Sequence, residues 1–166
     1  MKTPEHQRHK PPRKLDRPRE LVVACVAMRS NVNISAIART ASASGVQRLV
    51  LCGNARLISK IARDGDEQLD VEVRRTLPPV LRAFREEGYR IVGVEQATNS
   101  QNLQAFEFHR RTVLVIGNER LGISEEVLTL LDDVVEIPVY GMPHSFNAAA
   151  AAAMAMYEYC RQFPTG

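Results

Sequence analysis

The sequence predicts one α/β domain whose mostly parallel sheet carries helices on both faces. Segments with the character of strands alternate along the chain with segments of helical periodicity, which is the order that parallel β–α–β units produce. Some strand segments are apolar throughout, as expected of strands buried on both faces of a sheet. Polar residues, glycines and prolines gather in loops that follow such strands, and ligands of open α/β sheets bind at that edge.

The clearest expected strands are three apolar runs, namely residues 21–28 (LVVACVAM), 89–95 (YRIVGVE) and 112–117 (TVLVIG). Valine, isoleucine and tyrosine are frequent in these runs, and strands favour these residue types. Three shorter segments complete the expected sheet: residues 47–52, 71–75 and 134–138.

The first expected helix covers residues 33–44, which place apolar side chains on one side and end at Gly45, a residue suited to a helix C-terminus. Pro78 and Pro79 suit the first turn of a second helix that runs to about residue 87.

Ser124 is expected to be the N-cap of a third helix, whose first turn carries two glutamates that the helix dipole favours. The last helix begins with six successive alanines, Ala148 to Ala153, which lose almost no side-chain entropy in a helix and allow close packing. Residues 53–70 are expected to form a short helix near 57–62, followed by a polar loop.

The bulk composition is that of a globular domain. The chain has 166 residues, of which 45% are hydrophobic and 25% are charged, and these fractions are ordinary for such proteins. No apolar run approaches the ~20 residues that a membrane span needs, and the N-terminus lacks the pattern of a secretory signal. Three cysteines far apart, Cys25, Cys52 and Cys160, indicate reduced thiols and a cytoplasmic protein.

The first twenty residues carry the excess of positive charge, with seven basic and three acidic side chains among four prolines. Such a segment buries too little apolar surface to fold alone. We therefore expect an arm, residues 1–19, ahead of a folded domain, residues 20–166. The arm is either a solvated leader or a flexible binder of a polyanion such as RNA.

Three loops at strand ends hold the candidate site residues: 29–33, 117–123 and 139–147. The segment 117–124 (GNERLGIS) has the glycine spacing of a phosphate-binding loop, but Ile123 stands where that motif needs its lysine. No G-x-G-x-x-G dinucleotide fingerprint is present either, so an enzyme that uses ATP or NAD is disfavoured.

Each polar candidate also has an ordinary structural interpretation. Asn33 could cap a helix, Arg39 could be a surface charge, and Glu119 could be a solvated turn residue. A guanidinium in a run of small residues also suits the binding of a phosphate or carboxylate. Ser145 and Asn147 both open the last helix, where a cap accounts for only one of them.

A metal site or a histidine-based triad is not indicated. His144 has no acidic residue close to it in sequence, and the other histidines, His6, His9 and His109, follow no spacing typical of metal ligands.

Taken together, residues 31–46, 114–124 and 137–158 resemble the three motifs of the SpoU/TrmH family in the SPOUT class of RNA methyltransferases. The resemblance implies a C-terminal deep trefoil knot, S-adenosylmethionine as the cofactor, and methyl transfer to a ribose 2′-hydroxyl of tRNA or rRNA. It also implies a homodimer packed partly through the last helix, with no metal.

Residue by residue, the resemblance implies a catalytic set of Asn33, Arg39, Glu119, Ser145 and Asn147. It implies a cofactor-binding set of Glu95, Gly117, Asn118, Gly122, Ile137, Met142, Ser145 and Phe146. Arg39 would either accept the proton of the hydroxyl or bind the adjacent phosphate and stabilise the developing alkoxide. The family usually has leucine where Phe146 stands, which alters the expected shape of the adenine pocket.

The function expected is S-adenosylmethionine-dependent 2′-O-methylation of a structured RNA. The small size of the chain favours tRNA over rRNA as the substrate. The alternatives are an rRNA methyltransferase and a non-catalytic RNA-binding relative with the same fold.

Overall fold

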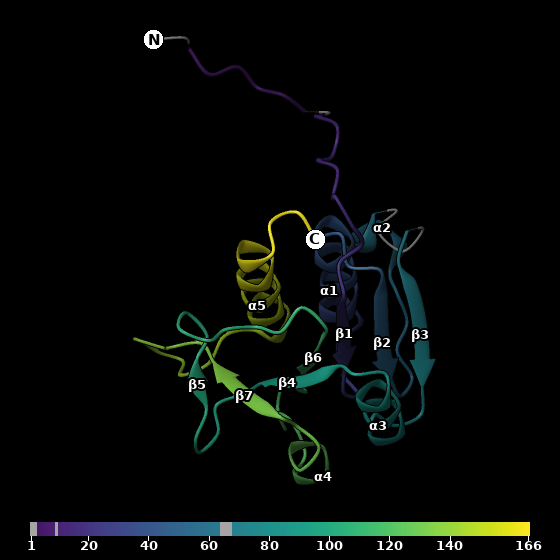
Figure 1. The fold of residues 1–166 in the computed structure, drawn as a ribbon, viewed down its shortest axis with the longest axis vertical. Coiled ribbons are helices and arrows are strands. Elements are labelled where there is room, and N and C mark those ends of the chain that lie inside the picture. The colour runs from purple at the N-terminus through teal and green to yellow at the C-terminus, as the bar shows by residue number, and fades with distance from the viewer. Residues whose placement is uncertain (1–2, 9, 64–67) are drawn as a thin grey trace.

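The computed structural model describes residues 3–8, 10–63 and 68–166. Within them, seven parallel strands form one sheet in the order β3-β2-β1-β6-β4-β7-β5 (Figure 1). The strands are β1 (Leu21–Cys25), β2 (Arg48–Cys52), β3 (Asp70–Arg74), β4 (Arg90–Val94), β5 (Gln101–Asn102), β6 (Thr112–Ile116) and β7 (Asp133–Glu136). The expected α/β fold with a parallel sheet is confirmed.

The helices are α1 (Asn31–Ala43), α2 (Ser59–Ala62), α3 (Pro78–Glu86), α4 (Glu125–Leu128) and α5 (Ala148–Gln162). Figure 1 shows α1 and α5 side by side, with α3 and α4 on the opposite side of the sheet. Among the described residues, no helix combines the length and the apolar character needed to cross a membrane. Part of the polar loop expected within residues 53–70 lies outside the described residues, as do Met1, Lys2 and His9 of the expected arm.

Two apolar cores lie on the two faces of the sheet. Strand β1 divides its side chains between them, because successive residues of a strand point to opposite faces. Leu21 and Val23 pack in the core that includes α1 and α5, whereas Val22 packs in the core that includes α3. Both β1 and β6 are buried along their whole length, as their continuous apolar runs predicted.

The three cysteines are free thiols in this arrangement. Cys25 and Cys52 are buried, and burial raises the pKa of Cys52 to about 11. These two thiols are therefore uncharged at neutral pH and pack as small apolar residues.

Helix α1 begins two residues earlier than expected. Its N-cap is Ser30, whose hydroxyl accepts a hydrogen bond from the backbone N–H of Asn33 at 3.2 Å. Asn33 lies inside the first turn, so it is not the cap and its side chain is available for other contacts. The expected end of the helix is confirmed, because Gly45 follows the C-cap with a positive φ of 75°.

The two-residue strand β5 was not expected. It pairs with β7 through Gln101 opposite Val135 and lies at the edge of the sheet. Two polar residues have no strand-like pattern, and the pairing depends on a neighbour more than thirty residues away.

Helix α5 lies between α1 and the connection of residues 95–111, which joins β4 to β6. The side-chain amide of Gln162 donates to the carbonyl of Phe106 at 2.7 Å, and its oxygen accepts from the N–H of Phe108 at 2.8 Å. The buried Tyr159 hydroxyl donates to the carbonyl of Arg110 at 2.6 Å. The C-terminal half of α5 is thus hydrogen-bonded to a segment that precedes it in the chain.

A buried guanidinium joins the C-terminal ends of α1 and α5. Arg19 is only 9% exposed, and it donates to the carbonyl of Ser44 at 2.7 Å and to the carbonyl of Phe163. Both carbonyls belong to C-cap residues, where the helix dipole favours a positive charge. Nearby, the N–H of Asp16 donates to the carbonyl of Thr165 at 2.9 Å, so the segment before β1 is fastened at this end.

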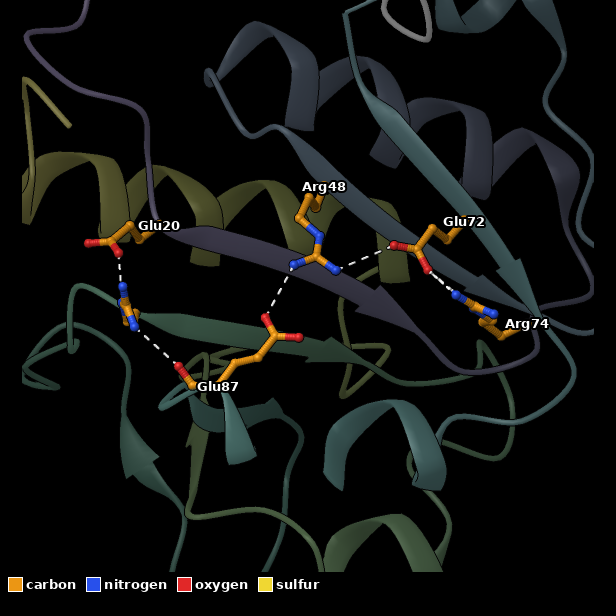
Figure 2. A network of polar contacts seen from close by, with 6 residues as sticks. Glu20, Arg48, Glu72, Arg74 and Glu87 are labelled. Atoms are coloured by element: carbon orange, nitrogen blue, oxygen red, sulfur yellow. Dashed lines mark hydrogen bonds and ion pairs between the residues drawn. The ribbon is translucent and has the colours of Figure 1, made fainter. Parts of the chain in front are cut away.

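Ion pairs cover the open face of β2 and β3 beside α3 (Figure 2). Arg48 lies 3.4 Å from Glu72 and 3.5 Å from Glu87, and Glu72 also pairs with Arg74 at 2.6 Å. The Arg48 guanidinium stacks 4.6 Å above the Phe84 ring. These charges neutralise one another along the edge of α3.

Candidate active site

A cavity of about 450 Å³ lies at the carboxyl ends of β4, β6 and β7. Its walls come from the ends of those strands, from the loops that follow them and from the first turn of α5. The lining residues are Val94, Glu95, Gln96, Ile116, Gly117, Asn118, Glu119, Arg120, Gly122, Ile137, Val139, Pro143, Ser145, Phe146, Asn147, Ala148 and Ala151. Its size is that of a small-molecule site, and its position is the one expected for parallel sheets.

The Glu119 carboxylate binds the N-terminus of α1. It accepts hydrogen bonds from the backbone N–H of Arg29 at 3.2 Å and of Ser30 at 3.0 Å, and from the Asn33 amide at 3.2 Å. Partial burial raises the pKa of Glu119, but hydrogen bonds from backbone N–H groups and from Asn33 outweigh it. The net pKa is below the ordinary value, so this group is a carboxylate at neutral pH.

Asn33 connects this carboxylate to α5. Its side-chain oxygen accepts a hydrogen bond from the side-chain N–H of Asn147 at 3.1 Å. The Asn147 oxygen in turn accepts from the N–H groups of Ala149 and Ala150, so Asn147 is the N-cap of α5. Glu119 can only accept, so it fixes the orientation of the Asn33 amide, which then fixes that of Asn147.

The loop after β6 is rigid. Asn118 and Gly122 exchange two backbone hydrogen bonds, and the Asn118 oxygen accepts from the N–H groups of Arg120 and Leu121. A Cβ on Gly117 would come within 2.9 Å of the Gly122 backbone, so the chain segments before and after this turn are in close contact. Gly122 also has a positive φ of 64°, which favours glycine.

Glu95 holds the same loop from the other side. Its carboxylate accepts from the N–H of Ile123 at 2.9 Å and from the N–H of Gln96 at 3.0 Å. A Cβ on Gly122 would collide with this carboxylate. Glu95 therefore lines the cavity and also sets the position of the loop.

Every residue from Tyr140 to Asn147 is exposed. Ser145, Phe146 and Asn147 line the cavity, and Phe146 is 42% exposed. Met142 does not line the cavity; it is 78% exposed. The Gln96 side chain donates to the carbonyl of His144 at 3.2 Å and so fastens this loop to the end of β4.

Arg39 lies apart from this group. Arg39 is six positions after Asn33, which places the two side chains about 120° apart around α1. Arg39 is exposed, does not line the cavity, and forms no side-chain hydrogen bond or ion pair with the described residues. The structure therefore brings Asn33, Glu119, Ser145 and Asn147 together and leaves Arg39 outside.

Two cavity residues with polar or charged side chains were missed by the sequence analysis. Gln96 follows the expected strand 89–95, and Arg120 lies inside the loop that had been singled out. Their positions after strand ends were the available signal. The described residues contain no group of three or more potential metal ligands.

Residues 20–157 match the model of the SpoU rRNA Methylase family. This chain belongs to the SpoU methylase family. The match covers the three polar loops, most of α5 and every residue that lines the cavity. It therefore confirms the resemblance that the three motifs indicated.

A curated relative is the tRNA (guanosine(18)-2'-O)-methyltransferase of Escherichia coli, 30% identical over 86% of this chain. The SpoU chain described here spans 64% of that relative's length.

Two solved structures share the fold. The Aquifex aeolicus TrmH/SpoU tRNA modifying enzyme is 30% identical, with a TM-score of 0.84 over 90% of this chain and 78% of that chain. The methyltransferase AviRb from Streptomyces viridochromogenes, solved in complex with the cofactor AdoMet, is 32% identical, with a TM-score of 0.76. That alignment covers 90% of this chain and 63% of AviRb. The likeness to SpoU structures implies the SPOUT knot, in agreement with the contacts between α5 and the connection that joins β4 to β6.

Proposed function

We propose that the protein transfers a methyl group from S-adenosylmethionine to a ribose 2′-hydroxyl of a structured RNA. The observation that carries this proposal is the bonded chain Glu119–Asn33–Asn147, which joins all three family motifs at the edge of one cavity. Membership of the SpoU family and the AdoMet complex of AviRb support the choice of reaction and cofactor.

The cavity suits S-adenosylmethionine. Val94, Ile116 and Ile137 provide apolar walls that can hold an adenine ring, and Phe146 adds an aromatic face. Glu95 and Gln96 place a carboxylate and an amide beside these walls, where they can accept from or donate to ribose hydroxyls. Donors and acceptors in this apolar setting are typical of a cofactor site.

When bound, the cofactor supplies a sulfonium methyl group that is already electrophilic, so the reaction needs no metal. Transfer would join the methyl carbon to the 2′-oxygen and break the sulfur–methyl bond, which leaves S-adenosylhomocysteine, and the hydroxyl proton would pass to solvent. Asn33 and Asn147 hold fixed amide orientations at the cavity edge and would position the cofactor loop and the target ribose. Ser145 is exposed at the cavity wall and would bind the ribose through its hydroxyl.

Arg39 would serve the reaction by binding a phosphate beside the target ribose and stabilising the alkoxide as it forms. Its position outside the cavity supports a homodimer, in which one copy supplies Arg39 to the site of the other. Val32 on α1 is 54% exposed, and Met154 and Tyr157 on α5 are 38% and 75% exposed. With the small alanine side chains of α5, they offer an apolar face that a second copy would cover.

The direct test is incubation of the protein with labelled S-adenosylmethionine and with bulk tRNA or rRNA, followed by mapping of the methylated nucleotide. Label in the 2′-O-methyl group of one nucleotide is the expected result. Tight cofactor binding in calorimetry without transfer to either RNA would favour a non-catalytic relative. Transfer to rRNA alone would replace tRNA as the substrate.

Mixing two inactive variants tests the shared site. Arg39→Ala and Asn147→Ala should each lose activity by roughly a hundredfold or more, with the fold retained. In a mixed dimer, one of the two sites would have both residues intact, so activity should partly return. A mixture as inactive as either variant, under conditions of subunit exchange, would contradict a composite site.

The N-terminal arm is expected to add non-specific phosphate contacts. Removing residues 1–18 should weaken RNA binding and flatten its salt dependence, because fewer counterions are released on binding. Cofactor affinity, measured by calorimetry, should be unchanged.

A further inference from the structure

Three exposed arginines surround the N-terminus of α1, each on a different loop. Arg29 follows β1, Arg56 follows β2 and Arg120 follows β6. Arg120 also lines the cavity and is its one cationic lining residue within the described part of the chain. The loops therefore carry positive charge to the same edge of the sheet that holds the cavity.

Hydrogen bonds that involve backbone groups fix the positions of these loops relative to one another. The N–H of Arg29 donates to Glu119, and the N–H of Arg120 donates to the Asn118 oxygen at 2.9 Å. The Asn118 amide donates to the carbonyl of Ala27 at 2.8 Å, which ties the loop after β6 to the loop after β1.

The loop that carries Arg56 is fixed relative to the other two loops through the first residue of α1. The N–H of Arg56 donates to the Asn31 side-chain oxygen at 3.1 Å. The N–H of Ile58 donates to the Ser35 hydroxyl at 2.8 Å and anchors the same loop to α1 again.

The guanidinium groups of these arginines are not neutralised by the described residues. None of the three takes part in an ion pair within residues 3–8, 10–63 and 68–166, whereas Arg48 and Arg74 on the other face are both paired (Figure 2). The two carboxylates of the cavity, Glu95 and Glu119, instead accept hydrogen bonds from backbone N–H groups. Unpaired guanidinium groups on rigid loops are pre-organised to bind oxyanions.

We infer that Arg29, Arg56 and Arg120 are positioning residues that bind the phosphates on either side of the target nucleotide and set the RNA strand across the cavity. This inference rests on the proposed function, because it takes RNA as the substrate. Phosphate is the ligand that fits three planar, unpaired guanidinium groups beside a site for a ribose. The contacts fix the register of the strand and carry no base specificity.

The test compares arginine-to-glutamine variants in the full chain. Binding of unfractionated tRNA is measured from about 50 to about 200 mM salt, where each lost phosphate contact lowers the slope of log Kd against log salt by roughly 0.7 to 1. The triple variant R29Q/R56Q/R120Q should lose about two to three units of slope and bind RNA roughly tenfold to a hundredfold more weakly. In methyl transfer, KM for RNA should rise much more than kcat falls.

Arg82→Gln is the matched control, because Arg82 is exposed on α3 and lies on the opposite side of the sheet. It should keep the affinity and slope of the unaltered protein. Equal slopes for the triple variant and the unaltered protein would overturn the inference, and so would an equal loss in Arg82→Gln. Calorimetry with S-adenosylmethionine separates the two proposals. The double variant R29Q/R56Q changes residues that do not line the cavity and should bind the cofactor normally, whereas failure of the unaltered protein to bind the cofactor would defeat the proposed function itself.

Discussion

The two ends of the helix pair α1 and α5 are joined by opposite kinds of contact. At the C-terminal ends, one buried guanidinium, Arg19, donates to two cap carbonyls. At the N-terminal ends, two side-chain amides meet beside a carboxylate, Glu119, and Asn147 is exposed. The C-terminal ends bind a positive group and the N-terminal end of α1 binds a negative one, as the helix dipole favours, whereas a neutral amide caps α5.

The difference separates a contact that stabilises the fold from contacts that serve activity. A buried contact contributes most to folding, because its loss leaves carbonyl groups without partners. An exposed amide pair contributes less to folding, because water can replace it, but it can touch a ligand in the cavity. We therefore expect changes at Arg19 to destabilise the fold and changes at Asn33 or Asn147 to affect methyl transfer.

The largest effect is expected at the buried end. Arg19→Met removes both donors while keeping an apolar side chain, and it should cost about 3 kcal/mol of unfolding free energy. Urea denaturation measures this loss. Arg17→Met is the comparison, because Arg17 is exposed and donates only at 3.3 Å to the carbonyl of Gly166. Equal stability of the two variants would show that the Arg19 contact is not a major support of the fold.

At the exposed end, Asn147→Asp divides the two roles of the residue. The aspartate can still cap α5, but it has no N–H to donate to Asn33, whose orientation Glu119 fixes. Methyl transfer should fall on the order of a hundredfold, as a small misplacement in an active site can cause. The urea midpoint should be close to that of the unaltered protein.

Asn147→Ala removes the cap as well and should also cost about 1 kcal/mol of stability. If both variants lost stability and neither lost activity, Asn147 would be a helix cap only.

A smaller effect is expected at Tyr159, where burial raises the pKa of the phenol to about 12, so the hydroxyl stays protonated and donates to the Arg110 carbonyl. Tyr159→Phe should cost about 1 kcal/mol in urea denaturation, because the carbonyl loses this donor. Cofactor affinity in calorimetry should not change, since Tyr159 lies outside the cavity. A drop in affinity would mean that this end of α5 also shapes the site.

The smallest effect is the pH dependence contributed by Glu119. Its pKa is lower in the folded protein than the ordinary value, so the folded state favours the carboxylate. The resulting stability is present above the unfolded pKa of ~4.3 and is lost as the pH falls through the folded pKa. The stability difference between the unaltered protein and Glu119→Gln should therefore shrink in urea melts below about pH 4.3. A difference that grew on acidification would contradict the lowered pKa.

Much of the fold could be predicted because burial leaves a clear pattern. The apolar runs of β1 and β6 need a central position in a parallel sheet, and the strand-end loops then meet at one edge. Strand β5 could not be predicted, because Gln101 and Asn102 are polar and pair only through a distant neighbour.

The candidate site was predicted as a group of loops but not as a set of contacts. The bond between Asn33 and Asn147 joins residues 114 positions apart, and no local pattern encodes such a pairing. The position of Arg39 away from Asn33 follows from helix geometry once α1 is known to be continuous. The role of Ser30 as N-cap was missed because Asn33 offered an equally good cap in the sequence.

The segment before β1 is hydrogen-bonded just beyond the C-terminal end of α5, whereas the cavity lies at the N-terminal end of this helix. A 15-residue helix is about 22 Å long, so the base of the N-terminal segment, bonded at Thr165, and the cavity, lined by the first turn of α5, lie at opposite ends of this helix. A single nucleotide cannot reach both. An RNA that engaged both the base of the N-terminal segment and the cavity, as proposed, would therefore have to span at least about 22 Å.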